Sequence, residues 1–183
     1  MNEKLKEILE TSLYFLGVLV FALLIVTFVG QRTIVDGESM MPTLNDKDNL
    51  IVDKISYRFG EPKRFDVIVF PPKNTKRTYY IKRVIGLPGE TVQITENGDI
   101  LINGVVLNEH YGAEVILKPG LASKPIVLGE DEYFVLGDNR NNSQDSRYES
   151  VGNIKKEEII GKAWVRVYPF NKIGSVKKFS EER

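Results

Sequence analysis

Cysteine is absent from the 183-residue sequence, and histidine occurs only once, as His110. Without cysteine the chain can form no disulfide framework, zinc–thiolate site or iron–sulfur cluster, and it has no cysteine nucleophile. A single histidine excludes a histidine-rich metal site and leaves one imidazole as a possible base. The sequence therefore predicts chemistry that needs no metal and no other cofactor.

The sequence also lacks an excess of charge of either sign. Its 25 basic and 25 acidic side chains give a formal net charge of zero, whereas a domain dedicated to nucleic acid is usually strongly basic. Nucleic acid is therefore not an expected partner. The length suggests one domain, or one domain with an appendage.

Charged residues are missing from one long segment, residues 11–31, and its central part, Leu13–Val29, is almost wholly apolar. As a helix rising about 1.5 Å per residue, this segment would match a hydrocarbon core roughly 30 Å thick. A buried helix of a soluble domain would show a polar stripe, and a cleaved signal peptide would end in a small-x-small cleavage site. Neither pattern is present. The sequence predicts one uncleaved transmembrane anchor at 11–31, after a tail of residues 1–10 and before a folded domain of residues 32–183.

Basic residues on the two flanks of the anchor bear on its orientation. Lys4 and Lys6 precede the anchor, and Arg32 follows it. The positive-inside rule counts lysine and arginine, and by two to one it favours a cytoplasmic N-terminus with an extracellular domain. The expected protein is a single-pass protein of the cell membrane, in contact with the lipid bilayer.

The residues after the anchor have the pattern of a β protein. Short runs rich in β-branched and aromatic residues alternate with turn signals, and the best short helix candidate is Lys155–Ile160. The pattern predicts a mostly β fold, a sandwich or a partly closed barrel. Residues 91–131 are the least regular part and are expected to form a small β insertion on the main sheet. The predicted strands are Asn49–Ile55, Asp66–Phe70, Thr78–Ile85, Thr91–Thr95, Ile100–Ile102, Tyr133–Leu136 and Ala163–Tyr168.

A serine lies in an irregular segment shortly after the anchor. Ser39 follows Gly37-Glu38 and precedes Met40-Met41-Pro42. Pro42 disfavours helix at the residue before it, and Gly37 permits close approach of the backbone. Taken alone, this pattern favours an ordinary surface serine over a nucleophile.

A lysine lies within an apolar and aromatic strand pattern. Alternation places Lys82 on the same face as Tyr80 and Val84. Burial of an ammonium group lowers its pKa, and a neutral lysine is a competent general base. The alternative is an edge-strand lysine that reaches solvent, which is the commoner use of lysine in β proteins.

A third segment, Gly137–Arg147, has no apolar side chain. It must be a loop, because it follows the predicted strand that ends at Leu136. Its many hydrogen-bond donors and acceptors suit either a solvated turn or a network that orients a neighbouring site. Composition does not distinguish these two.

Together with a further motif, these segments resemble the type I signal peptidases of bacteria. The similarity covers the N-terminal anchor and four blocks in order, and so most of the chain apart from residues 91–131. The single anchor and the short length resemble the form found in Gram-positive bacteria. The four blocks are Gly37–Leu44, Arg64–Phe70, Tyr80–Glu90 and Gly137–Arg147.

The resemblance implies a serine endopeptidase with a Ser–Lys dyad, in which Ser39 is the nucleophile and Lys82 is the general base. It implies that Ser143 orients Lys82 by a hydrogen bond. No catalytic role falls to His110. Two stabilising pairs are also implied: Asp145 with Arg147, and Arg83 with Asp138.

One position departs from the family pattern. Some members carry a serine two positions before the nucleophile, and its hydroxyl contributes to the oxyanion hole; here that position is Gly37. The oxyanion hole must then rely on backbone N–H groups, most obviously that of Ser39. Loss of one oxyanion donor can cost roughly 3 kcal/mol in the transition state, so some replacement is expected.

The substrates implied by the resemblance are the signal peptides of secreted preproteins, cut after small-x-small sequences. The enzyme is expected to act as a monomer. An extended substrate could add as a strand beside the segments that carry Ser39 and Lys82. Signal peptides emerge on the outer face of the membrane, which agrees with the predicted orientation. Shallow pockets that admit only small side chains are expected from Val35, Met40, Tyr80 and Ile81.

Two other classes of protein stay open from the sequence. A Ser–Lys self-cleaving protein of the repressor type would need a helix-turn-helix module, where this chain has the predicted anchor. A non-enzymatic membrane-anchored β-domain, such as a receptor or an assembly factor, would make Ser39 and Lys82 incidental. Cleavage of a signal-peptide substrate that is lost when Lys82 is replaced would distinguish the enzyme from a non-enzymatic β-domain.

Overall fold

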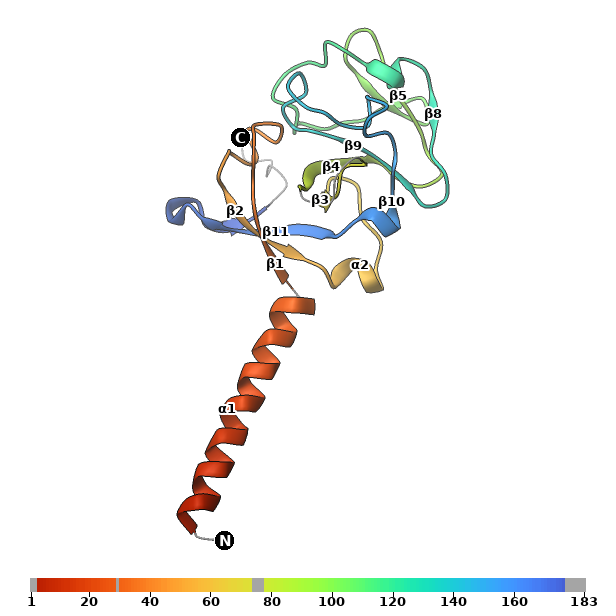
Figure 1. The fold of residues 1–183 in the computed structure, drawn as a ribbon. Helices are drawn as coiled ribbons and strands as arrows, with labels where there is room; N and C mark the ends of the chain where they lie inside the picture. Colours follow the sequence, from red (N-terminus) through yellow and green to blue (C-terminus); the bar gives the residue numbers. More distant parts are fainter. Residues whose placement is uncertain (1–2, 29, 74–77, 177–183) are drawn as a thin grey trace.

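The computed structural model describes residues 3–28, 30–73 and 78–176. The chain begins with a 26-residue helix, α1 (Glu3–Phe28), which extends away from the β body (Figure 1). Most of the large apolar side chains between Ile8 and Leu23 are exposed. Across the described residues, no helix has both the length and the apolar character needed to cross a membrane.

The predicted anchor and the observed elements have different bounds. The helix starts at Glu3, within the predicted tail, and the last two residues of the predicted span, Gly30 and Gln31, belong to the first strand. Val29 lies outside the described residues. The transmembrane anchor therefore stays a prediction from the sequence.

The body is mostly β, as predicted. Its larger sheet is built from antiparallel ladders and curls into an open half-barrel (Figure 1). The end strands of the path, β1 and β10, do not pair with each other in the described residues, so the sheet is not closed. In order along the sheet the strands are β1 (Gly30–Ile34), β2 (Asn49–Asp53), β11 (Gly161–Tyr168), β3 (Val67–Phe70), β4 (Tyr80–Gly86), β9 (Glu132–Leu136) and β10 (Ile154–Lys155), with β12 (Gly174–Ser175) paired to β11.

Residues 91–131, expected as an insertion, contain a separate four-stranded sheet at the end of the body opposite to α1 (Figure 1). This sheet packs closely on the larger one at Gly86, where a Cβ atom would lie 2.5 Å from a methyl group of Val92. Glycine is therefore needed at this crossing. The strands are β7 (Val105–Val106), β6 (Ile100–Ile102), β5 (Thr91–Ile94) and β8 (Ile126–Val127).

The segment predicted as a short helix, Lys155–Ile160, forms little more than one helical turn. The Glu158 carboxylate accepts a hydrogen bond from the Lys155 N–H at 2.8 Å, and the chain then extends so that Ile160 N–H donates to Val69 O at 2.9 Å. Pairing with β3 therefore ends the turn. The short helices are α2 (Ser56–Phe59), η1 (Gly120–Ser123), η2 (Lys156–Glu158) and η3 (Phe170–Lys172).

One of three buried apolar clusters lies directly under the serine-bearing loop. Met40 and Leu44 come from that loop, and they pack against side chains of the central strands. Burial of a side chain of this size contributes roughly 1.5–3 kcal/mol, so these two residues fix the loop to the sheet. The other buried members are Val35, Leu50, Val52, Val67, Val69, Ile81 and Ala163.

Candidate active site

The loop between β1 and β2 presents Ser39 at the surface of the body. Its two ends are joined by backbone hydrogen bonds from Val35 N to Asp48 O (2.8 Å) and from Lys47 N to Val35 O (2.9 Å). Gly37 has φ of +95°, a conformation that favours glycine, and its N–H donates to Asp46 Oδ1 at 2.9 Å. Ser39 itself is half-buried.

Lys82 lies in the middle of β4 and faces this serine. Its side chain is 3% exposed, and its register partner on β3 is Ile68. The Nζ atom is 2.7 Å from Ser39 Oγ and 3.0 Å from Ile81 O. Tyr80, which alternation places on the same face, has its ring centroid 5.3 Å from Nζ. The structure thus brings together two residues 43 positions apart.

Burial lowers the pKa of Lys82 from 10.5 to about 8, although the carboxylates of Asp145 and Asp138 oppose this change. Desolvation is the larger effect because no carboxylate is ion-paired with Lys82 among the described residues. At pH 7 about a tenth of the lysine would then be neutral. In the neutral form Nζ accepts, and the 2.7 Å contact becomes a hydrogen bond donated by the Ser39 hydroxyl.

A cavity of about 370 Å³ opens beside this pair. It is lined by the serine loop, by the polar loop that follows β9, and by residues of β4. Most of the lining groups are polar, and Tyr80 is among the few aromatic ones. The lining residues are Asp36, Gly37, Glu38, Ser39, Tyr80, Lys82, Asn141, Asn142, Ser143, Gln144 and Tyr148.

Ser143 lines the same cavity as Lys82, but the hydrogen bond implied by the resemblance is not formed in this structure. The Ser143 Oγ atom is buried and has no hydrogen-bond partner. It lies close to Gly137, where a Cβ atom would be 2.2 Å from Oγ. Gly137 therefore makes room for Ser143, and the orienting role of Ser143 stays a prediction.

Arg83 and Asp138 form a fully buried ion pair on the other face of β4. Arg83 Nε and Nη2 donate to the two carboxylate oxygens at 2.8 and 2.6 Å. The guanidinium also donates to Phe65 O at 2.9 Å, and Thr43 Oγ1 donates to Asp138 Oδ2 at 2.5 Å. Thr43 belongs to the serine loop, so the pair ties that loop to the loop after β9.

Asp145 and Arg147 form a second buried ion pair, with Nε–Oδ1 and Nη2–Oδ2 distances of 2.8 and 2.9 Å. Asp145 Oδ2 also accepts from the Gly137 N–H at 3.1 Å, and Arg147 Nη2 donates to Arg140 O at 2.5 Å. The two ends of the polar loop are therefore cross-linked. Gly137–Arg147 is a fixed network rather than a solvated turn.

The four residues expected to shape substrate pockets lie in different surroundings. Val35, Met40 and Ile81 are buried together in the cluster beneath the serine loop. Tyr80 is half-buried and lines the cavity. Their part in substrate selection stays a prediction.

Two contributors to the site were missed from the sequence. Asn139 N donates to Ser39 O at 3.1 Å, and Asn139 Nδ2 donates to Glu38 O at 3.2 Å. Tyr111 places its ring 3.9 Å from Arg83 Cζ. Asn139 lies within a motif and could have been weighed, whereas no sequence signal connects Tyr111 with Arg83. His110 is exposed and lines a different cavity.

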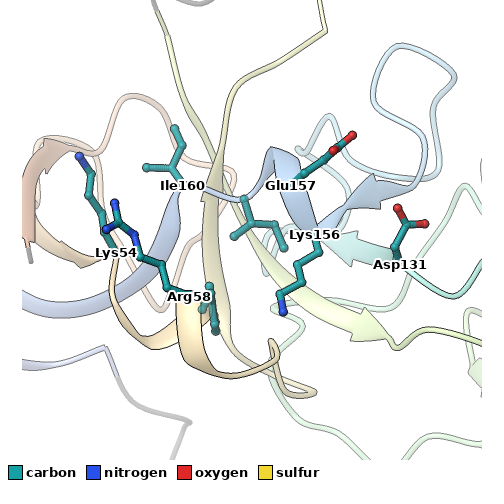
Figure 2. Close-up of a pocket in the computed structure, with 8 residues that line it drawn as sticks. Lys54, Arg58, Asp131, Lys156, Glu157 and Ile160 are labelled. Carbon is teal, nitrogen blue, oxygen red and sulfur yellow. The ribbon is translucent and has the colours of Figure 1, made fainter. Parts of the chain in front are cut away.

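A larger cavity, about 530 Å³, shares no lining residue with the Ser39–Lys82 cavity. Figure 2 shows charged side chains of both signs around it, among them Lys54, Arg58, Asp131 and Glu157. Its lining includes no serine beside a lysine. Its size alone therefore does not make it the better candidate for chemistry.

The serine–lysine contact defines a class of site: a hydroxyl nucleophile beside a base whose pKa is lowered by burial, as in serine hydrolases that use no histidine. Comparison with known proteins narrows this class. The family model described as "Signal peptidase, peptidase S26" matches residues 8–168. The chain belongs to this signal peptidase family.

Individual relatives agree with this assignment. A signal peptidase I of Leptolyngbya laminosa is 46% identical over 86% of this chain and 78% of its own length. A signal peptidase I P of Bacillus subtilis subsp. natto is 35% identical over 96% of this chain and 97% of its own. A solved structure of a signal peptidase I from Enterococcus faecalis is 36% identical, covers 56% of this chain and 97% of that chain, and has a TM-score of 0.46. The resemblance noted from the motifs is confirmed by the family match and the curated relatives.

Proposed function

We propose that this protein is a membrane-anchored serine endopeptidase that removes signal peptides from secreted preproteins by means of a Ser39–Lys82 dyad. The observation that carries the proposal is the 2.7 Å contact between Lys82 Nζ and Ser39 Oγ. The lysine is buried and its pKa is lowered to about 8, which suits a general base near neutral pH. Membership of the signal peptidase family supports the substrate class.

The proposed reaction has two halves. Neutral Lys82 accepts the Ser39 proton while Oγ attacks the scissile carbonyl carbon, and the resulting ammonium group protonates the leaving amine as the C–N bond breaks. An acyl-enzyme remains on Ser39. Lys82, neutral again, then accepts a proton from a water molecule that attacks the ester, and returns that proton to Oγ. Each half transfers one proton through the same nitrogen.

The oxyanion that forms in each half needs a hydrogen-bond donor. Gly37 offers no side chain, and its N–H already donates to Asp46 Oδ1. The N–H of Ser39 has no acceptor among the described residues. We assign the oxyanion contact to the Ser39 N–H; a second donor in place of the missing side-chain hydroxyl is expected, because loss of one donor can cost roughly 3 kcal/mol.

The cavity suits an extended chain with small side chains. Its lining includes Asp36–Glu38 of the serine loop, Asn141–Gln144 of the polar loop, and Tyr80. Met40 directly follows Ser39 and Ile81 directly precedes Lys82, and both side chains are buried in one cluster with Val35. This packing next to both dyad residues supports the expected preference for small residues before the cut. The extended substrate would pair with the neighbouring backbone.

The proposed anchor is the apolar segment 11–31, with residues 1–10 in the cytoplasm and the β body outside. The exposed apolar side chains of α1 and its position away from the body support contact with lipid (Figure 1). An exposed surface of this kind is unfavourable in water. If the proposal holds, detergent will release the full chain from membranes, whereas high salt will not.

The direct test is cleavage of a signal-peptide substrate by the purified full chain. The wild-type protein is expected to cut after the small-x-small sequence, and Lys82→Ala is expected to be inactive. Lys124→Ala, at an exposed position, is the matched control and should be unaffected. Cleavage that persists in Lys82→Ala would contradict the dyad. A wild-type protein that cuts only its own chain would favour a self-cleaving protein, and one that binds the peptide without cutting would favour a non-enzymatic β-domain.

A further inference from the structure

A segment of the insertion, Glu109–Ala113, lies against the part of the polar loop that contacts the serine loop. Ala113 N donates to Asp138 O at 2.9 Å. Glu109 Oε1 is 2.7 Å from Arg140 Nη1, and Glu109 Oε2 accepts from the Tyr111 N–H at 2.7 Å. The segment is therefore attached to the loop on both sides of Asn139.

The attachment at Arg140 depends strongly on Glu109. The Arg140 side chain is 3% exposed, and Glu109 is its ion-pair partner in the described part of the chain. Within the described ranges, Arg140 Nε and Nη2 have no hydrogen-bond partner. Gly112 packs on the guanidinium so closely that a Cβ atom there would lie 3.2 Å from Arg140 Cζ. A buried cation with one carboxylate partner is strongly destabilised when that carboxylate is removed.

Besides the Ala113 hydrogen bond, the segment contacts Asp138 indirectly, because Tyr111 packs on Arg83 and Arg83 binds Asp138. The Tyr111 ring stacks 3.9 Å from Arg83 Cζ and packs on the Phe65 ring, with 4.9 Å between the centroids. An aromatic face over a desolvated guanidinium is attractive. The ring therefore holds Arg83 in the position from which it binds both oxygens of Asp138.

Asn139 lies between these two fixed residues and contacts the nucleophile's backbone. Its N–H donates to Ser39 O at 3.1 Å, and its side-chain amide donates to Glu38 O at 3.2 Å. A change in Asp138 or Arg140 would move Asn139, and with it the backbone that carries Ser39 Oγ and the proposed oxyanion N–H. Ser39 Oγ lies 2.7 Å from Nζ of Lys82, which is 3% exposed.

We propose that Glu109 and Tyr111 are positioning residues for the Ser39 nucleophile: they fix Asp138 and Arg140, so that Asn139 holds the backbone of Glu38 and Ser39. This inference rests on the proposed function of the Ser39–Lys82 dyad. It assigns a role in the reaction to residues 91–131, which lie outside the motifs of the family. A displacement of about 1 Å at a reacting group can cost roughly 100-fold in rate.

Substitution of either residue should therefore lower turnover without weakening substrate binding. In the full chain, Glu109→Gln and Tyr111→Leu are each expected to reduce kcat about tenfold, with KM unchanged, because neither residue lines the Ser39–Lys82 cavity. Movement of the serine loop would admit water to Lys82, so the midpoint of the pH–rate profile should rise. Tyr111→Phe keeps the aromatic face on Arg83 and should keep more activity than Tyr111→Leu.

The experiment measures kcat, KM, the pH midpoint and the melting temperature of each variant, with kcat determined well below melting. Glu96→Gln, an exposed acidic position in the same insertion, is the matched control. If Glu109→Gln and Tyr111→Leu lower the melting temperature but leave kcat and the pH midpoint unchanged, the inference is overturned. A wild-type protein without activity, or an active Ser39→Ala variant, would instead overturn the proposed function on which the inference rests.

Discussion

Lys82 and Arg83 are neighbours in β4, both are buried, and each faces a different side of the strand. Arg83 has a carboxylate on two of its nitrogens and an aromatic ring on its face. Among the residues that the structure describes, Lys82 has only a hydroxyl and a carbonyl oxygen within hydrogen-bond distance. These contacts compensate the burial of the Arg83 guanidinium, whereas burial lowers the pKa of the Lys82 ammonium group. Arg83 is paired with a carboxylate and is therefore a structural cation. Lys82 has no carboxylate partner among the described residues and can therefore act as a base.

The largest expected effect follows from replacing the two dyad residues, Ser39 and Lys82. Ser39→Ala and Lys82→Ala are each expected to lower kcat by about 10⁴-fold or more, and the double variant should be little worse than either single one, because nucleophile and base act as a unit. The measurement is steady-state cleavage of a signal-peptide substrate, with folding checked by circular dichroism. Losses that multiply in the double variant would show that the two residues act independently.

On the Arg83 face the expected loss is in stability. Asp138→Asn leaves a buried guanidinium without its carboxylate, and should reduce the free energy of unfolding by about 3–5 kcal/mol. Urea denaturation measures this change, and Asp131→Asn, at an exposed position, should alter stability by less than about 0.5 kcal/mol. If Asp138→Asn cost no more than the control, the Arg83 pair would not be a structural element.

On the Lys82 face the expected effect on stability has the opposite sign. The folded-state pKa of about 8 is below the ordinary value of 10.5, so between these pH values the unfolded chain binds more protons and wild-type stability rises with pH. Lys82→Met has no such dependence. Its stability relative to wild type should therefore be greater below pH 8 than at pH 10.5, by about 3 kcal/mol.

Urea denaturation of wild type and Lys82→Met at several pH values checks this sign. Lys124→Met is the control, because Lys124 is exposed and forms no ion pair among the described residues. A constant difference between pH 6 and 10 would mean that Lys82 keeps an ordinary pKa in the folded protein.

The sequence alone predicted part of the surroundings of Lys82 and part of the strand pattern. Alternation placed Lys82 on the same face as Tyr80 and Val84, which pack in one cluster, and the strand predicted at Ile100–Ile102 has the predicted bounds. Short strands such as β7, β8 and β12 were not predicted, since two residues carry no periodicity. Tyr111 was also missed, because its contact with Arg83 depends on how the insertion folds back on the sheet.

The smallest expected effect concerns Ser143. The resemblance to signal peptidases implied a hydrogen bond between Ser143 and Lys82, which this structure does not form. If Ser143 orients Lys82 during the reaction, Ser143→Ala should lower kcat about tenfold with KM unchanged. The melting temperature should not fall, since the hydroxyl makes no hydrogen bond in the structure. Unchanged kcat would mean that Ser143 only fills the space beside Gly137.

The central claim is that Lys82 is a base because it is buried without a carboxylate partner. The pH dependence of kcat/KM for a signal-peptide substrate tests it most directly. The rate should rise with pH and level off with a midpoint near 8, the pKa of Lys82, because only neutral lysine accepts the Ser39 proton. A midpoint near 10.5 would contradict the claim, as would one near 6.5 that is lost in His110→Ala.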